Sequence, residues 1–231
     1  TVKKFLLILI VLLGLFLRTI KLDTRPAGFT WDEAALGYNA YSLLKTGRDE
    51  YGKFMPLVFK SFGEYKPGLY IYSTVPAVKL FGLNELAVRI PSAVFGTLLI
   101  VVVYLLTHHL FGRKFAIFSA LTTSLMPWAI HFSKGAWEAN VALTLTTFAT
   151  LLFLRRRFAL SALFFGITFW TYHGSKLFTP LIIFTLLVLY NSRYLFRDLV
   201  KPLFIGFAIA LPILVGAATQ SGRLKVFSVF S

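Results

Sequence analysis

Long runs of apolar residues separated by short basic gaps dominate the chain. The first run covers Phe5–Leu17, behind Lys3 and Lys4. Six more follow, at Ile90–Leu110, Phe115–Ile130, Asn140–Leu154, Phe158–Tyr172, Leu177–Tyr190 and Leu203–Thr219. A helix needs about 17–25 mainly apolar residues to cross a bilayer. The pattern therefore predicts an all-α, polytopic transmembrane protein with about seven spans, several of them near the short limit.

Residues 18–88 differ from the rest, because Gly and Pro interrupt them and no long apolar run occurs. Thr30 and Glu33 have the spacing of a capping box, which predicts that a helix begins here, runs to Lys45 and ends at Gly47. The apolar and aromatic face of this helix suits the membrane surface. The sequence thus predicts a long loop that carries helices close to the membrane.

A second helix of this kind is predicted at Gly68–Gly82. The segment is apolar but short, and it contains Pro76 and Lys79. If it crossed the bilayer, the alternation of charge between successive loops would be lost. We therefore expect it to lie in the membrane interface.

The distribution of charge predicts an orientation. Every second gap is rich in Lys and Arg, as at Arg113-Lys114 and Arg155–Arg157, and cytoplasmic loops carry this excess. The N-terminus is therefore expected in the cytoplasm of a multi-pass cell-membrane protein. Eight carboxylates then share the extracytoplasmic side: Asp23, Asp32, Glu33, Asp49, Glu50, Glu64, Glu85 and Glu138.

Composition excludes several other classes. The chain of 231 residues is 57% hydrophobic and only 14% charged, which excludes a soluble enzyme and a disordered tail. Its net charge of +15 does not indicate nucleic acid, because the basic residues occupy the gaps, where they set topology and contact lipid headgroups. There is no Cys, and nucleotide-binding or hydrolase motifs such as GxGxxG, GxxxxGK[ST], GxSxG and HExxH are absent.

Asp32 is the strongest candidate for chemistry. It follows Trp31 at the start of the first loop helix, where Thr30 and Glu33 already cap the helix. Glu33 is therefore expected to serve the helix cap. Asp32 has no capping role and lies where bilayer meets water, so we expect it to be functional.

Glu64 and Lys66 form a second candidate site. Pro67 favours an extended conformation for the residue before it, so both side chains are expected on one side of the chain. The carboxylate and the ammonium group would bind a metal ion, a phosphate or each other.

Three further residues are expected on the same side of the membrane. Glu138 opens the fourth predicted span, where an acid either compensates the helix dipole or serves a site. His173 would bind a metal ion or a phosphate, and Lys176 is a plausible partner for an anion. For the lone histidine, a structural role is the alternative.

In order and spacing these features resemble the polytopic C-type glycosyltransferase superfamily. The closest resemblance is to family 39, which contains protein O-mannosyltransferases and the lipid A aminoarabinose transferase. The matching stretches are Trp31–Ala34, Glu64–Leu69, Lys79–Ser92, Leu110–Arg113 and Trp137-Glu138. Because relatives have more spans and a C-terminal part, residues 1–231 are expected to form an N-terminal transmembrane glycosyltransferase domain, truncated relative to them, with 18–88 as its extracytoplasmic loop.

The resemblance implies a polyprenyl-phosphate-linked sugar donor and transfer to an acceptor hydroxyl, with inversion, on the extracytoplasmic face. By position, Asp32 and Glu138 match the catalytic acids. Glu64, Lys66, His173 and Lys176 match contacts of the donor phosphate or another substrate. A divalent cation is a possible cofactor, with Glu64 and His173 as candidate ligands. The expected partners are the donor, a glycan, lipid or protein acceptor and membrane lipids, with no nucleic acid.

Two other classes of membrane protein share some of these features. A transporter or flippase for a lipid-linked substrate would use the charged residues as a pathway, but it predicts internal symmetry and charges at mid-membrane. The sequence shows no internal repeat. A membrane scaffold without catalysis would leave Asp32 and Glu138 freely replaceable.

Overall fold

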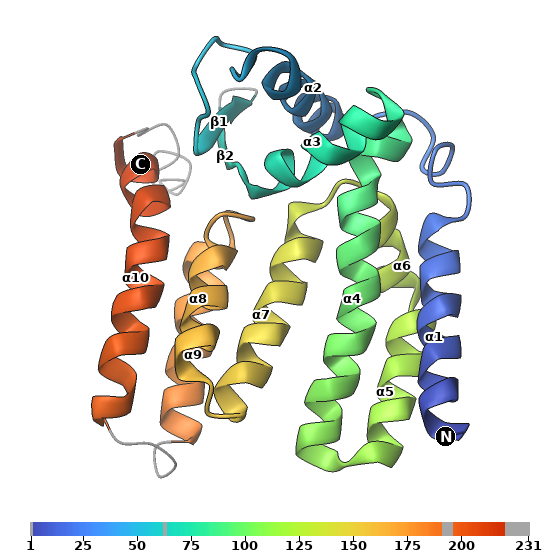
Figure 1. Ribbon diagram of the computed structural model, residues 1–231, viewed down its shortest axis with the longest axis vertical. Coiled ribbons are helices and arrows are strands. Elements are labelled where there is room, and N and C mark those ends of the chain that lie inside the picture. Colours follow the sequence, from blue (N-terminus) through green and yellow to red (C-terminus); the bar gives the residue numbers. More distant parts are fainter. Residues whose placement is uncertain (1, 62–63, 191–195, 220–231) are drawn as a thin grey trace, which may run out of the picture.

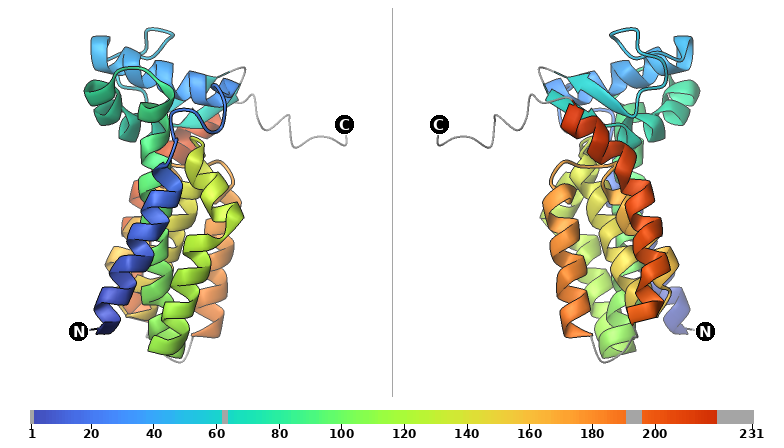
Figure 2. Two further views of the ribbon diagram at one scale, coloured as in Figure 1. Left: turned by 90° about the vertical axis from the view of Figure 1, so that its right-hand side faces the viewer. Right: turned by 90° about the vertical axis from the view of Figure 1, so that its left-hand side faces the viewer.

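The computed structural model describes residues 2–61, 64–190 and 196–219, except for the side chains of residues 2–4, 64, 196 and 217–219. A bundle of helices runs along the long axis, and a layer of shorter elements lies across one end of it (Figures 1 and 2). We call this layer, residues 20–84, the loop layer. The N-terminus lies at the opposite end of the bundle (Figure 1).

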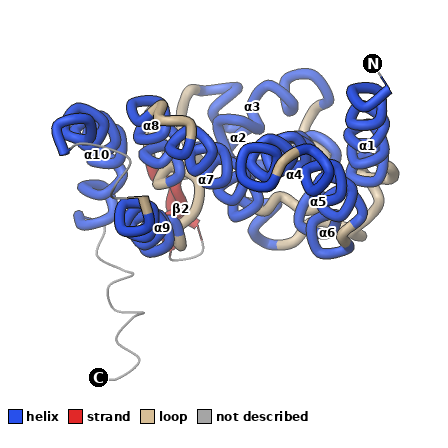
Figure 3. Tube along the Cα trace, turned by 90° about the horizontal axis from the view of Figure 1, so that it is seen from below, coloured by secondary structure: helices blue, strands red, loops and turns tan. Residues whose placement is uncertain are grey.

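Each apolar run of the sequence contains at least one helix in the structure. The bundle contains α1 (Val2–Thr19), α4 (Glu85–Phe111), α5 (Arg113–Leu125), α6 (Pro127–Lys134), α7 (Glu138–Leu154), α8 (Phe158–Thr168), α9 (Ser175–Leu189) and α10 (Phe196–Thr219). Viewed along the bundle, α1, α4, α5 and α6 gather on one side and α8, α9 and α10 on the other, with α7 between them (Figure 3). The protein is mainly helical, as predicted.

Fewer helices are long enough to cross a membrane than the seven spans predicted from the sequence. Among the described residues, only Glu85–Phe111 and Arg197–Gly216 are long and apolar enough to cross a membrane by themselves. The bent pair α5 and α6 adds a third if it counts as one span. The other apolar helices are shorter, because turns and helix ends occupy part of the predicted runs.

The predicted run Phe115–Ile130 is divided by a break between α5 and α6. The two helices meet at an angle of 54°, because Pro127 lacks the N–H group that would continue α5. The buried Arg18 fills the gap, donating to the carbonyl oxygens of Thr123 at 2.9 Å and Ser124 at 3.1 Å. A residue that the sequence places at the flank of the first run is thus a buried partner of carbonyls at the C-terminal end of α5.

The first loop helix, α2 (Trp31–Thr46), begins and ends as its sequence predicts. The Thr30 side chain accepts a hydrogen bond from the Glu33 backbone N–H, and the Glu33 carboxylate accepts one from the Thr30 backbone N–H. At the other end Gly47 adopts φ 68°, a left-handed conformation that suits glycine. The position of Asp32, in the first turn, is fixed by this cap.

Two short strands correct the prediction of an all-α fold. β1 (Val58–Ser61) pairs antiparallel with β2 (Glu64–Pro67), with Lys60 opposite Tyr65. Each strand has only four residues, too few for an alternating pattern to be recognised in the sequence. The extended conformation predicted for Lys66 is therefore part of a β-hairpin.

The hairpin leads directly into α3 (Leu69–Phe81), the helix predicted between Gly68 and Gly82. The backbone N–H of Leu69 donates to the Trp170 carbonyl, 2.9 Å away, in the segment between α8 and α9. At the same end of the bundle, the indole of Trp170 donates to the carbonyl of Ile209 in α10 at 2.7 Å. These bonds attach the loop layer to the second half of the bundle.

A continuous apolar core joins the loop layer to the bundle. Buried residues from α2, β1, α3, α4 and α7 pack in one cluster, among them Leu36, Phe59, Tyr70, Val88 and Val141. Gly37 allows the close approach of α2 to α4, since an added Cβ would lie 2.6 Å from a methyl group of Val88. The candidate residues of the loop layer are thus held on the end of the bundle by packing.

Candidate active site at the junction of the loop layer and the bundle

Five of the residues singled out in the sequence meet where the loop layer contacts the bundle. They are Asp32 in α2, Lys66 in β2, Glu138 at the start of α7, and His173 and Lys176 around the start of α9. We call these five side chains the junction site. Figure 1 shows the parts of α2, β2, α7 and α9 that carry them at one end of the molecule.

An ion pair between Asp32 and Lys66 joins the two segments of the loop layer. The Nζ atom of Lys66 lies 2.5 Å from Oδ1 of Asp32, across 34 residues of sequence. The Lys66 side chain is 9% exposed, whereas that of Asp32 is 59% exposed. Lys66 therefore points inward beneath a carboxylate that remains open to an approaching molecule. The side chain of Glu64, the partner expected for Lys66 from the sequence, lies outside the described residues.

Glu33, the neighbour of Asp32, has a structural task beyond the helix cap. Its carboxylate pairs with the fully buried Arg89 of α4 at 2.8 Å and accepts the backbone N–H of Ala136 at 3.1 Å. Burial alone would raise the pKa of the Glu33 carboxyl, but hydrogen bonds from Arg89 and two backbone amides outweigh it and hold the pKa below its usual value. Because Ala136 precedes Glu138 by two residues, this ion pair fixes α2 against the start of α7.

Arg89 is the residue that sequence reasoning missed. Besides Glu33, its guanidinium binds the backbone carbonyl oxygens of Leu22, Pro26 and Gly28. All five donors of a guanidinium can be used in this way, which a lysine cannot do. An arginine in the first turns of an otherwise apolar helix is the signal that would have identified it.

Glu138 is the first residue of α7, just before the apolar run Asn140–Leu154, and its side chain is half-buried. Among the described residues, its Oε1 atom has no hydrogen-bond partner. Burial, with a smaller contribution from the charge of Asp32, raises the pKa of Glu138 to about 7, against the opposing effect of Lys66. A carboxyl group with this pKa exchanges its proton near neutral pH.

The raised pKa of Glu138 predicts a pH-dependent stability. Since the folded state favours the protonated acid, the stabilisation is complete below the ordinary pKa of 4.5 and is lost as pH rises through about 7. The free energy of unfolding should therefore fall by on the order of 3 kcal/mol across this range relative to Glu138→Gln. Thermal melting of both proteins in detergent at several pH values measures the difference.

The comparison with Glu138→Gln at each pH is necessary because His173 acts in the opposite direction. Burial and the neighbouring Lys176 lower the pKa of His173 to about 4, so its contribution to stability grows as pH rises from about 4 to 6.5. A constant difference between wild type and Glu138→Gln across the pH range would contradict the assigned protonation of Glu138.

His173 and Lys176 form the opposite wall of the junction site. The Nζ atom of Lys176 lies 3.4 Å from Nδ1 of His173, and Nε2 of His173 is buried without a partner among the described residues. With its lowered pKa the imidazole is neutral near pH 7. Burial also lowers the pKa of Lys176. Two of the three orphaned buried polar atoms in the described structure, those of Glu138 and His173, thus belong to this site.

A metal site is not assembled by the described residues. Among them, no three His, Asp or Glu side chains come together in a way that would hold an ion. Of the two candidate ligands, His173 is present in the junction site, and the side chain of Glu64 is outside the described residues. We therefore assign no step to a metal ion.

The junction site combines an accessible carboxylate, a second carboxyl group that titrates near pH 7, two lysines and a neutral imidazole. The lysines suit a phosphate group, and the carboxylate suits the removal of a proton from a hydroxyl group. Such a set can hold an anionic group and accept a proton beside it.

Comparison with known proteins identifies the family and the fold of the chain. The sequence profile of the family described as dolichyl-phosphate-mannose-protein mannosyltransferase matches residues 66–218, more than half of the chain. The match begins at Lys66 and leaves the segment with Asp32 outside it. No curated protein matches the sequence.

Two solved structures share the fold. The crystal structure of ArnT from Cupriavidus metallidurans in the apo state has a TM-score of 0.75 and 17% identity, over 100% of this chain and 45% of ArnT. For the same protein bound to undecaprenyl phosphate, the TM-score is 0.74 and the identity 18%, over 96% of this chain and 43% of ArnT. The chain thus spans less than half the length of ArnT.

The resemblance noted in the sequence is confirmed by the family profile and by the fold. The profile covers the hairpin strand with Lys66, α4, α7 with Glu138, and the turn with His173. The chain belongs to the dolichyl-phosphate-mannose-protein mannosyltransferase family.

Proposed function

We propose that this chain carries the catalytic site of a membrane glycosyltransferase, which moves a hexose or pentose from a polyprenyl-phosphate donor to an acceptor hydroxyl group. The observation that carries the proposal is the Asp32–Lys66 ion pair beside the half-buried Glu138. In the proposal the Asp32 carboxylate is the base, and the Lys66 ammonium group in contact with it binds the phosphate. The structure of ArnT with undecaprenyl phosphate supports the class of donor.

In the proposed reaction the acceptor oxygen attacks C1 of the sugar, and the bond between C1 and the phosphate oxygen breaks. Asp32 takes the proton of the attacking hydroxyl group, and the leaving polyprenyl phosphate keeps the electron pair of the broken bond. Attack opposite to the leaving group inverts the configuration at C1. Glu138, half-buried near Asp32, orients the sugar or the acceptor.

The negative charge that grows on the leaving phosphate needs cations near it. Lys66 supplies one when the phosphate replaces Asp32 as its partner, which also frees Asp32 to act as a base. Lys176 supplies a second, and the neutral His173 can donate a hydrogen bond from the same wall. Glu64 precedes Lys66 on the same strand and belongs to the proposed donor-binding region.

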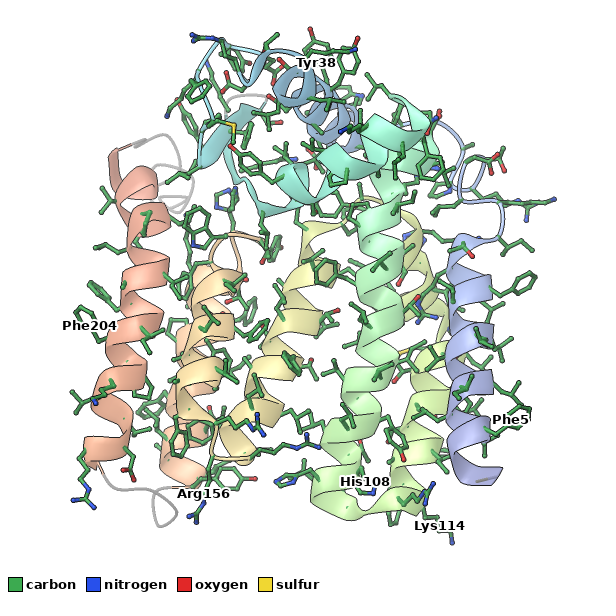
Figure 4. All side chains as sticks on the ribbon, in the orientation of Figure 1. Phe5, Tyr38, His108, Lys114, Arg156 and Phe204 are labelled. Atoms are coloured by element: carbon green, nitrogen blue, oxygen red, sulfur yellow. The ribbon has the colours of Figure 1, made fainter. Side chains whose placement is uncertain are left out.

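The proposed topology places the junction site on the extracytoplasmic face, with seven apolar segments in the membrane and the N-terminus in the cytoplasm. The basic residues at the opposite end of the bundle, such as Lys114 and Arg156 (Figure 4), support this orientation. The segments that carry the junction site, in α2 and β2 and at the starts of α7 and α9, lie at one end of the bundle (Figure 1). This favours a transferase over a flippase, which needs a polar path across the membrane.

Removal of the Lys66 charge should weaken donor binding. The variant Lys66→Gln is expected to raise the Kd for a polyprenyl-phosphate sugar about 10- to 100-fold, since a charge-assisted hydrogen bond contributes about 1.5–3 kcal/mol. Titration of the purified protein with the donor measures the change. The control is Lys60→Gln, which removes an exposed lysine from the partner strand. Equal Kd values for wild type and Lys66→Gln would refute the assigned contact.

The proposed function is tested by transfer itself. Membranes containing the protein are incubated with radiolabelled polyprenyl-phosphate sugars of several kinds, and the labelled product is identified. We expect label to move from the lipid fraction to a protein, glycan or glycolipid. If every donor is carried across the membrane without loss of its sugar, the protein is a flippase and the proposal is wrong.

A further inference from the structure

A hollow lies at the end of the bundle away from the junction site, between the turn that joins α7 to α8 and the first turns of α10. Five charged residues line it, namely Arg156, Arg157, Arg197, Asp198 and Lys201. Arg156 is labelled at this end in Figure 4. The two segments are distant in sequence and meet because α8 packs along α10.

The four cationic side chains of the hollow are available to a ligand. All four residues are exposed, and among the described residues none of their side chains has a hydrogen-bond or ion-pair partner. Arg197 and Lys201 are four positions apart in α10 and therefore share a helix face. One carboxylate, Asp198, accompanies the four cations. An anion bound here would relieve the mutual repulsion of the cations.

The backbone conformation of Arg156 indicates that its side chain has a function. The backbone N–H groups of Arg156 and Arg157 donate to the carbonyl oxygens of Phe153 and Leu152, which is the hydrogen-bond pattern of a Schellman motif. Arg156 occupies the position of that motif with φ 58°, where glycine is the usual residue. A charged residue held in a conformation that suits glycine points to a function of the side chain.

Apolar residues form the other part of the lining and identify the kind of anion. Phe158, Leu160 and Pro202 line the same hollow as the cations. Inorganic phosphate has no apolar part that could contact these side chains, whereas a lipid presents a phosphate and acyl chains together. The hollow also lies at the end of a helical bundle, at the depth expected for lipid headgroups.

We propose that this hollow binds the phosphate group of an anionic membrane lipid. The headgroup lies over Arg156, Arg157, Arg197 and Lys201, and the acyl chains follow the apolar wall between α8 and α10. The site is separate from the junction site, and binding here does not depend on the transfer reaction.

The test is a titration of the purified protein in a maltoside detergent with short-chain phosphatidylglycerol, by isothermal calorimetry. We expect saturable binding at one site. Phosphatidylcholine, which carries no net charge, and inorganic phosphate are titrated in parallel. Both should bind at least tenfold more weakly than phosphatidylglycerol. Phosphatidylcholine loses the equivalent of about two cation contacts, and inorganic phosphate lacks the apolar contacts. Equal affinity for inorganic phosphate would show that the apolar wall plays no part and would overturn the assignment to a lipid.

Two variants and one control locate the site. Arg156→Gly removes one cation and places glycine in the left-handed conformation, so the fold is retained and affinity should fall about fivefold. The double variant Arg157→Gln, Lys201→Gln should lower it about 25-fold. Arg155→Gln removes a charge from the same turn outside the lining and should leave affinity unchanged. If Arg155→Gln weakens binding as much as Arg156→Gly, the attraction is only that of a basic surface and the proposal fails.

Discussion

Replacing Asp32 with asparagine is expected to lower the rate of sugar transfer about 10²–10⁴-fold, the usual contribution of a general base. Asparagine has nearly the same shape as aspartate and cannot accept the proton of the acceptor hydroxyl group at neutral pH. The measurement is transfer of radiolabelled sugar from its polyprenyl-phosphate carrier, with equal amounts of wild type and Asp32→Asn in the membrane.

The control variant for Asp32 is Asp23→Asn, which removes an exposed carboxylate from the same loop layer. It should transfer sugar at the wild-type rate. The Asp32 side chain is more than half exposed, and the α2 cap does not use it. Because the amide oxygen of asparagine can still accept a hydrogen bond from Lys66, Asp32→Asn should insert and melt close to wild type. A well-inserted Asp32→Asn protein with normal transfer would refute the role of this residue as base.

The second large effect is expected at Arg89. The variant Arg89→Met should lower the free energy of unfolding by about 3–5 kcal/mol, because it leaves the buried Glu33 carboxylate without its charged partner. Three carbonyl groups of the loop layer would lose their donor in the same step. Thermal melting and limited proteolysis of residues 20–30 measure the loss of order.

A double variant separates loss of the ion pair from loss of packing. In Arg89→Met, Glu33→Gln no buried carboxylate remains, so part of the lost stability should return. Arg25→Met, which changes an exposed arginine in the same loop, should melt like wild type. If Arg89→Met is as stable as wild type, the pair does not fix α2 on the bundle.

Local signals in the sequence were sufficient for most helices. Thr30, Glu33 and Gly47 define both ends of α2 by chemistry within a few residues, and the structure places the ends there. The helix between Gly68 and Gly82 is likewise fixed by its flanking glycines and its apolar content. Such signals work because the interactions concerned span three or four residues.

Interactions between distant segments could not be predicted in this way. The pairing of Lys66 with Asp32 depends on how the hairpin folds over α2, and the hairpin itself is too short to show a pattern. Arg18 and Arg89 have the appearance of flanking charges in the sequence, but both are fully buried and bind backbone carbonyls. The length of an apolar run and the charges beside it indicate where a helix lies along the chain. Which polar side chains become buried depends on how the helices pack together.

The sharpest test of the proposed site is to find where the lipid carrier binds. A photoreactive polyprenyl phosphate is cross-linked to the purified protein, and the labelled peptides are identified by mass spectrometry. Label should appear in the segments around Lys66 and His173, and unlabelled polyprenyl phosphate should compete with it. Labelling confined to the basic hollow around Arg156, with none at Lys66 or His173, would contradict the assignment of the junction site as the place of transfer.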